Sequence, residues 1–360
     1  MHPRVLFCSV TDLPGHGGIA RVSSMAWQTI QEEYPGACER LIASSSPTGE
    51  LTSADKVRFS AALAERQLRS RCDVVFFDHL GLARVQNLVP KRVRRPYGVF
   101  LHSVEAWAPL SRSRQQALKH AKLRVANSHY TADRISSEQA CAGPIQVCYL
   151  TLARETIFEA REARSASNGC HALRLIRPGS VLIAGRIVRS ERHKGHAELI
   201  RSWPLVLRDA PNSQLVIVGQ GDGVAELQDL AATLGVKEHV LFTGFVDDRT
   251  LREIYARVSL FAMPSRGEGF GIVYLEAMFH RLACIGSVDG AAREVIVDGE
   301  TGFLVNQGDL NSIAARVTQL LKDAHLRAKF GENGFRRVQA HFSPEQFHSR
   351  FANLMRELSE

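Results

Sequence analysis

The sequence lacks several patterns that would each place it in a common class of protein. No apolar run approaches the 18 or more residues that a helix needs to cross a bilayer. The cysteines number seven and include no Cys-x-x-Cys pair, which argues against both a disulfide framework and a zinc site. Asp-x-Asp occurs nowhere, so no metal clamp is indicated. The Gly-x-Gly-x-x-Gly fingerprint is also missing, which argues against an NAD-dependent oxidoreductase.

The remaining composition is typical of a cytoplasmic globular protein. Apolar residues make up 45% and aromatic residues 7% of the 360 residues, enough for cores in two domains of ordinary size. Cys8, Cys148 and Cys284 lie in apolar runs, where we expect buried thiols in a reducing compartment. Residues 1–14 contain a single arginine and a short apolar run, which predicts a first strand and no signal peptide.

Positive charge is concentrated in the first half of the chain. Residues 1–150 contain 19 Lys and Arg against 12 Asp and Glu, whereas the remainder contains 26 against 25. Two explanations fit this excess equally well. The basic residues could form a solvated face, or they could attract an anionic membrane surface or an anionic acceptor. Nucleic acid is a weaker option, because no known nucleic-acid motif is present. The densest basic positions are Lys91, Arg92, Arg94, Arg95, Arg112, Arg114, Lys119, Lys122 and Arg124.

Apolar strand-like runs alternate with helical segments along almost the whole chain. This alternation predicts parallel, doubly wound α/β sheets, in which ligands bind at the carboxyl ends of the strands. A polar stretch at residues 151–178 predicts a connection between two Rossmann-like domains, residues 1–160 and residues 161–342. The predicted strands are 5–10, 38–44, 73–78, 97–101, 123–127, 145–150, 180–184, 214–218, 240–243, 258–263 and 283–287.

The chain ends in a predicted amphipathic helix. The helix begins at Ser343, with Pro344 at its first helical position. A terminal helix packed on its own domain would satisfy this pattern. Its apolar residues share one face and are Phe347, Phe351, Leu354 and Leu358.

Residues 265–278, Ser-Arg-Gly-Glu-Gly-Phe-Gly-Ile-Val-Tyr-Leu-Glu-Ala-Met, organise the second half of the chain. A glycine-rich loop between a strand and a helix offers free backbone N–H groups, which suit an anionic phosphate. Two carboxylates bracket the helix start: Glu268 in the loop, and Glu276 about five residues into an apolar helix. Each has a simpler explanation, since Glu276 could pair with an internal arginine and Glu268 could be solvated.

Three further places could contact a ligand. Arg186 follows a predicted strand and Lys194 precedes the next helix; two such cations can clamp a diphosphate, although both could be ordinary surface residues. His102 falls at a strand end, where an exposed loop histidine is the alternative. Gly17 and Gly18 lie in a glycine-rich turn between the first strand and the first helix, where the backbone can approach a ligand closely.

The two glutamates, separated by seven residues that include Gly-Phe-Gly, resemble the signature of retaining glycosyltransferases of family 4, the glycosyl transferases group 1. The resemblance covers residues 179–339 strongly, and includes the Arg186 and Lys194 positions. It implies the GT-B fold, in which two doubly wound Rossmann-like domains face a central cleft. It also implies that residues 343–360 form a helix that crosses back to the N-terminal domain.

The resemblance also implies a role for each candidate residue. Glu276 would hold the ribose hydroxyls of a sugar nucleotide, and Arg186 and Lys194 would hold its diphosphate. Val246 would contact the nucleobase edge, and His102 the sugar near the reacting carbon. Glu268 and the backbone of Gly269, Phe270 and Gly271 would hold the transferred sugar.

We therefore predict a metal-independent, retaining hexosyltransferase that needs no cofactor and uses a UDP- or GDP-linked sugar as its donor. The acceptor is predicted to be a glycan or a polyprenyl-linked precursor in the synthesis of cell-surface polysaccharide or lipopolysaccharide. A peripheral position on the inner face of the membrane is a further option, through the basic N-terminal domain. A GT-B sugar phosphorylase and a catalytically silent sugar-nucleotide-binding partner subunit are the alternatives.

Overall fold

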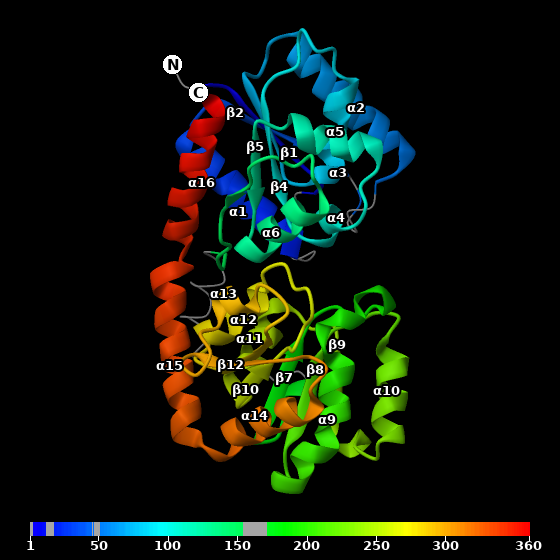
Figure 1. Cartoon of the computed structure of the whole chain (residues 1–360), viewed down its shortest axis with the longest axis vertical. Coiled ribbons are helices and arrows are strands. Elements are labelled where there is room, and N and C mark those ends of the chain that lie inside the picture. Colours follow the sequence, from blue (N-terminus) through cyan, green and yellow to red (C-terminus); the bar gives the residue numbers. More distant parts are fainter. Residues whose placement is uncertain (1–2, 12–17, 45, 47–50, 154–170) are drawn as a thin grey trace. The chain divides into compact units, whose positions relative to one another are not determined.

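In the computed structural model, each of two compact units is built on its own six-stranded sheet (Figure 1). The structure describes residues 3–11, 18–44, 46, 51–153 and 171–360. Unit 1 contains residues 1–153 and 344–360, and unit 2 contains residues 154–343. The predicted domain boundary between residues 160 and 161 lies outside the described residues.

All strands of the sheet in unit 1 run parallel, in the order β2-β1-β3-β4-β5-β6. The central strands are almost entirely apolar and fully buried, as expected of a parallel sheet covered by helices on both faces. The strands are β1 (Val5–Ser9), β2 (Cys38–Ile42), β3 (Val74–Phe77), β4 (Tyr97–Leu101), β5 (Leu123–Ala126) and β6 (Gln146–Val147). The helices are α1 (Gly18–Glu33), α2 (Ser53–Leu68), α3 (Leu80–Ala83), η1 (Arg84–Leu88), α4 (Val104–Trp107), α5 (Arg112–His120), α6 (His129–Glu138) and α16 (Pro344–Ser359).

One residue of the basic first half does not lie on the surface. Arg124 was predicted among the densest basic positions, but its side chain is buried. Its guanidinium donates hydrogen bonds to the carbonyls of Leu118 and Lys119, both at 2.7 Å. These are unpaired carbonyls of the last turn of α5, where a cation is favoured. Arg124 therefore caps a helix, and it does not contribute to an external basic surface.

The sheet of unit 2 is also parallel throughout, in the order β12-β11-β10-β7-β8-β9. Its strands are β7 (Ser180–Ala184), β8 (Gln214–Val218), β9 (Val240–Gly244), β10 (Leu260–Ala262), β11 (Ala283–Ser287) and β12 (Gly302–Val305). Its helices are α8 (His171–Arg174), η2 (Arg189–Lys194), α9 (His196–Asp209), α10 (Val224–Thr233), η3 (Lys237–His239), α11 (Asp248–Arg257), α12 (Ile272–Phe279), α13 (Ala292–Val295), α14 (Leu310–Lys322) and α15 (Ala324–His341).

Strand β12 was not predicted, because its sequence reads as a turn. Gly302 opens the strand, and a Cβ atom built there would lie 2.0 Å from the carbonyl oxygen of Cys284. Only glycine lets the chain approach β11 this closely. Glycine usually weakens strands, but at position 302 it allows β12 to form.

The last helix, α16, belongs to unit 1, as predicted for a helix that returns to the N-terminal domain. Its apolar face packs on the sheet, where the Phe351 ring meets the Phe76 ring edge-on with 5.1 Å between centroids. A Cβ atom at Gly98 of β4 would lie 3.2 Å from the Leu358 side chain, so the missing side chain makes room for the helix. Burial of this face stabilises unit 1 with residues from the far end of the chain.

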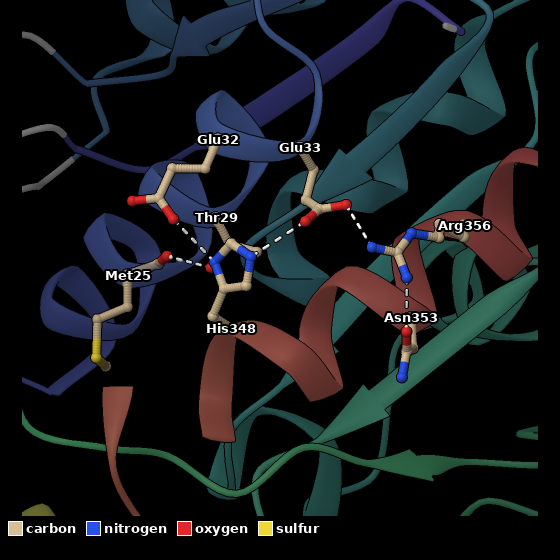
Figure 2. A network of polar contacts seen from close by, with 7 residues as sticks. All are labelled: Met25, Thr29, Glu32, Glu33, His348, Asn353 and Arg356. Carbon is tan, nitrogen blue, oxygen red and sulfur yellow. Dashed lines mark hydrogen bonds and ion pairs between the residues drawn. The ribbon is translucent and has the colours of Figure 1, made fainter. Parts of the chain in front are cut away.

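Polar contacts also join α16 to α1 (Figure 2). The His348 ring lies between two carboxylates, with Nδ1 3.0 Å from Glu32 Oε2 and Nε2 3.1 Å from Glu33 Oε1. Arg356 donates to the other Glu33 oxygen at 2.6 Å, and to Asn353 at 2.8 Å. The hydrogen bond from Arg356 lowers the pKa of Glu33 below its ordinary value.

None of the helices in the described ranges is both long enough and apolar enough to cross a bilayer.

We expect Glu33→Gln to lower the free energy of unfolding of the protein by about 1 kcal/mol at pH 7, because the Arg356 ion pair is lost. The pKa of Glu33 is lower in the folded protein than its ordinary value of 4.5, so the wild-type ion pair stabilises the fold above that pH. Its contribution disappears as the pH falls through the folded pKa. Denaturant unfolding at pH 7 and pH 3 should therefore show a deficit only at pH 7.

Glu357→Gln is the matched control, because Glu357 is an exposed glutamate of α16, the helix that carries Arg356. It should leave the free energy of unfolding unchanged at both pH values. An equal deficit for Glu33→Gln at pH 7 and pH 3 would contradict the assignment to the Glu33 carboxylate.

Candidate functional site

The order of strands in unit 2 defines where a ligand would bind. From β7 the chain proceeds to β8 and β9 on one side, and then returns to form β10 on the other side of β7. In open parallel sheets, ligands bind beyond the carboxyl ends of the two strands at such a reversal. Arg186 comes directly after β7, and the glycine loop of residues 264–271 comes directly after β10. The fold therefore brings these two predicted segments to one place.

Arg186 and Lys194 share one carboxylate partner, which the sequence analysis did not identify. Glu191 lies between the two cations, with Oε1 against the Arg186 guanidinium and Oε2 2.7 Å from Lys194 Nζ. The Glu191 and Lys194 side chains are mostly buried, at 18% and 17% exposed, whereas Arg186 is 71% exposed. The Lys194 side chain passes over Gly185, where a Cβ atom would lie 3.8 Å from Nζ. Both predicted diphosphate ligands therefore converge on a single anionic group.

The other charges of this loop point to a different partner. Arg189 and Arg192 each lie 2.8 Å from a separate oxygen of Glu226 in α10. The Arg189 N–H also donates to Asp222 at 2.9 Å. The loop is thus fastened to α10 on one side, and its two remaining cations face Glu191.

A glycine turn after β8 packs against the backbone of the loop that carries Arg186. Sequence analysis had no chemistry to assign to Gly219 and Gly221. A Cβ atom at Gly219 would lie 1.9 Å from the Gly185 carbonyl oxygen, and one at Gly221 would lie 2.2 Å from that of Ile187. Both glycines also have positive φ angles, +146° and +150°. They are needed because two backbone segments touch here, and the segment that they support carries Arg186.

The glycine loop after β10 is fixed by backbone hydrogen bonds to two neighbouring loops. The Arg266 N–H donates to the His193 carbonyl at 2.8 Å, which connects the loop directly to the Lys194 segment. The Gly267 N–H donates to the carbonyl of Asp289 at 2.6 Å, and the Glu268 carbonyl accepts from Ala291 at 3.0 Å. Asp289 and Ala291, in the segment after β11, therefore help to hold the loop that carries Glu268.

Glu268 lies within the electrostatic reach of the cations. Burial raises the pKa of Glu268, and the Glu191 carboxylate raises it further. Lys194, a backbone hydrogen bond from Gly269 and Arg186 act in the opposite direction. The alternative of a solvated loop residue is wrong, since Glu268 is half-buried among charged groups.

At the start of α12 the Phe270 side chain is buried, whereas the backbone of the glycine loop can still contact a ligand. Gly271 has a φ of +84°, and a Cβ atom there would meet the Tyr274 ring at 2.5 Å, so glycine is required. The Phe270 side chain is buried against Phe342, with 5.9 Å between ring centroids. Phe270 can therefore contact a sugar only through its backbone, as predicted.

Glu276 occupies the fifth position of α12 and is only 6% exposed. The Tyr255 hydroxyl donates a hydrogen bond to Glu276 Oε2 at 3.0 Å. Tyr255 stacks in turn on His280, with ring centroids 5.2 Å apart. The aromatic pair orients the carboxylate within an apolar helix, a role that the sequence alone did not reveal.

Val246, the predicted nucleobase contact, lies between β9 and α11 and is half-buried. The preceding residue, Phe245, is 69% exposed, which is unusual for so large an apolar side chain. Both follow the carboxyl end of β9, on the same edge of the sheet as Arg186.

In unit 1, His102 is buried at the carboxyl end of β4, so the alternative of an exposed loop histidine is wrong. Its Nε2 atom lies 2.7 Å from the carbonyl oxygen of Asp78, and its ring stacks on Phe100 with centroids 5.0 Å apart. The Asn127 side chain donates to the His102 carbonyl at 2.8 Å. Gly18 begins α1, and Gly17 lies outside the described residues.

Asp78 is a further polar residue at this edge that sequence analysis did not select. It follows β3, next to β1, where the order of strands reverses in this sheet as well. One carboxylate oxygen accepts from the Val10 N–H at 3.1 Å. Burial raises the pKa of Asp78 to about 6. A polar residue directly after a fully apolar strand was the available signal.

Within the described part of the chain, no group of three or more His, Cys, Asp or Glu side chains is placed to hold a metal ion.

Comparison with known proteins gives a family for the segment that carries Arg186, Lys194, Glu268 and Glu276. The family model of glycosyl transferases group 1 matches residues 178–337. This segment is a glycosyl transferases group 1 domain. The chain is 38% identical over 148 residues to a GDP-mannose-dependent α-(1-6)-phosphatidylinositol monomannoside mannosyltransferase of Mycolicibacterium smegmatis, a match that covers 39% of each chain.

A second relative of the chain is the lipopolysaccharide core biosynthesis mannosyltransferase LpcC of Rhizobium leguminosarum. It is 34% identical over 174 residues, which cover 47% of this chain and 49% of LpcC. The chain thus matches less than half the length of either relative.

Solved structures match the described fold over nearly the whole chain. Anabaena Alr3699/HepE in complex with UDP and glucose has a TM-score of 0.76 at 20% identity, covering 99% of this chain and all of that one. Sucrose-phosphate synthase from Thermosynechococcus elongatus has a TM-score of 0.78 at 18% identity and covers 99% of both chains. The predicted GT-B fold is confirmed: two parallel sheets with alternating helices.

Proposed function

We propose that this protein is a retaining glycosyltransferase. It moves a hexose from a UDP- or GDP-linked sugar to a glycan or lipid-linked acceptor in the synthesis of cell-surface polysaccharide or lipopolysaccharide. One observation carries the proposal: Arg186 and Lys194 converge on a single anionic group beside Glu268, at the strand reversal of a glycosyl transferases group 1 domain.

The arrangement of unit 2 suits a sugar nucleotide. Two cations at the carboxyl end of β7 can replace the hydration of a diphosphate, with one guanidinium fork and one ammonium point charge. Glu276 is an acceptor-only carboxylate that two ribose hydroxyls can bind. Glu268, held by the loop of residues 264–271, would accept hydrogen bonds from the hydroxyls of the transferred sugar.

Departure of the sugar builds negative charge on the diphosphate. Fixed cations stabilise that charge without reorganisation, so Arg186 and Lys194 would lower the barrier and take the place of a metal ion. We infer that the acceptor attacks from the face that the diphosphate leaves, and that the diphosphate takes the proton of the acceptor hydroxyl. His102 would contact the sugar near the reacting carbon. The anomeric configuration of the donor is then kept.

The names of similar proteins support the choice of donor. A relative of the domain is GDP-mannose-dependent, and a protein of the same fold was crystallised with UDP and glucose. Other relatives are named for lipopolysaccharide core and capsular polysaccharide biosynthesis. These names support a nucleotide-linked hexose and an acceptor in cell-surface glycan synthesis.

A thermal-shift screen of nucleoside diphosphates and their sugars tests the proposal. A ligand at 100 times its Kd stabilises a protein by about 2.7 kcal/mol, so a UDP or GDP compound should raise Tm by several degrees. Glu276→Ala should weaken that nucleotide at least about tenfold, because hydrogen bonds to a charged acceptor are lost. Tyr255→Phe, which removes only the orienting hydroxyl, should have a smaller effect.

Glu300→Ala is the matched control, because Glu300 is an exposed glutamate of the same unit. It should respond like the wild type. A shift by inorganic phosphate and sugar phosphate, with none by any nucleotide, would favour a phosphorylase. Tight nucleotide binding without transfer to any acceptor would favour a silent partner subunit.

Retention is tested separately, by proton NMR of the first-formed product. The coupling constant of the anomeric proton should match that of the donor. Inversion at the anomeric carbon would contradict attack from the same face.

We also infer that exposed basic residues of unit 1 bring the protein to an anionic membrane surface. Three exposed basic residues lie in two segments of unit 1: Lys91 and Arg92 between η1 and β4, and Arg112 at the start of α5. A hydrogen bond joins the two segments, because the Asn87 side chain of η1 donates to the Ser113 carbonyl of α5 at 2.8 Å. Leu88, 74% exposed, lies beside them. Each basic residue near an anionic surface contributes about 1 kcal/mol, and salt screens the attraction.

Vesicle flotation checks this inference. Wild-type protein should float with anionic vesicles at low salt and be released at high salt. The double variant Lys91→Glu and Arg92→Glu should bind at least about tenfold more weakly. Lys322→Glu with Lys329→Glu, an equal charge change on unit 2, is the control. Flotation that is insensitive to anionic lipid and to salt would contradict membrane attraction.

A further inference from the structure

One carboxylate occupies the position that the proposed function assigns to a phosphate. Glu191 offers one oxygen to the Arg186 guanidinium and the other to Lys194 Nζ, which lies 2.7 Å away. A carboxylate and a phosphate both present oxygens to such cations in this bridging manner. In the structure, therefore, the two cations are already engaged by an anion that belongs to the chain.

Glu191 is not needed to fasten the loop to the rest of unit 2. Arg189 and Arg192 do that, through Glu226. Glu191 instead has an irregular backbone within η2, with φ −114° and ψ 33°, where the helical path is broken. Its side chain is thereby directed to the cations on the side of Glu268, whose pKa it raises.

The burial of Lys194 explains why a counter-charge is present. At 17% exposure, an ammonium group without a partner would be costly. A carboxylate in contact with it removes this cost while no ligand is bound. Arg186 at 71% exposure has no such need, and its contact with Glu191 holds its long side chain in one orientation.

We propose that Glu191 is an internal counter-anion: it positions Arg186 and Lys194 in the free protein and competes with the diphosphate for both cations. The inference rests on the proposed function, because it assumes that these two cations bind the diphosphate. Glu191 acts on the ligand through the cations and is a positioning residue.

Competition from Glu191 should weaken binding of the nucleoside diphosphate product more than binding of the nucleotide-sugar donor. Repulsion from a fixed carboxylate grows with the charge on the ligand. The released nucleoside diphosphate has a free terminal phosphate, whereas in the donor that phosphate is esterified to the sugar and carries less charge. Glu191 should therefore weaken binding of the product more than binding of the donor, and so promote product release.

Isothermal titration with Glu191→Gln tests the inference. The amide keeps the size of the side chain and removes its charge. We expect UDP or GDP, whichever binds the wild type, to bind about tenfold more tightly, the matching nucleotide sugar to gain less, and the dependence on salt to become steeper. Inorganic pyrophosphate, a probe without base or sugar, should gain affinity as the nucleoside diphosphate does.

Glu226→Gln is the matched control, because Glu226 is the other carboxylate that binds cations of this loop. It should leave all these affinities within about twofold of the wild type. If Glu191→Gln does not fold, as judged by circular dichroism, Glu191→Asp replaces it. The shorter side chain reaches the cations less well, so the same ligands should again bind more tightly.

The outcomes separate this inference from the proposed function. Unchanged or weaker binding of nucleoside diphosphate by the Glu191 variant, with normal binding by the wild type, contradicts the inference and leaves the proposed function standing. Equal gains for donor and product contradict the argument about release. A folded wild type that binds no nucleotide and no pyrophosphate contradicts the proposed function itself.

Discussion

Within a parallel sheet covered on both faces, a charged side chain needs buried partners, as Arg124 of β5 has in two carbonyls, and charges are more easily accommodated where the strands end. In both units the central strands are buried along their full length. A polar group inside such a sheet loses its hydration and has to recover hydrogen bonds within the protein. The candidate site residues of unit 2 therefore lie in the loops and helix starts that follow the strands, and the order of strands decides which of these segments become neighbours.

In unit 2 this constraint joins segments far apart in sequence. Arg186 and the loop of Glu268 are about 80 residues apart, yet they flank the same reversal of strand order because β7 and β10 are paired. Glycines make the approach possible. Gly219 and Gly221 let one turn touch the backbone that carries Arg186, and Gly271 admits the turn that begins α12.

The charges assembled in this way are not independent. Lys194 contacts Glu191 and lowers the pKa of Glu268, whereas Glu191 raises the pKa of Glu268. An anion that enters this group meets two cations and two carboxylates at once. Binding and release of a phosphate are then set by the balance of the group, and removing a single charge alters that balance.

The sequence by itself determined the fold class and the glycine loop, which follow from apolar runs of strand length and from glycines at turns. Arg186, Lys194, Glu268 and Glu276 were selected as candidates by their charges next to such turns together with the resemblance to glycosyl transferases group 1. Only the tertiary structure decided that Glu191 bridges the cations, that Tyr255 orients Glu276, that Arg124 is buried, and that Gly302 opens a strand. Each of these depends on where a distant backbone passes, and short-range periodicity carries no information about that path.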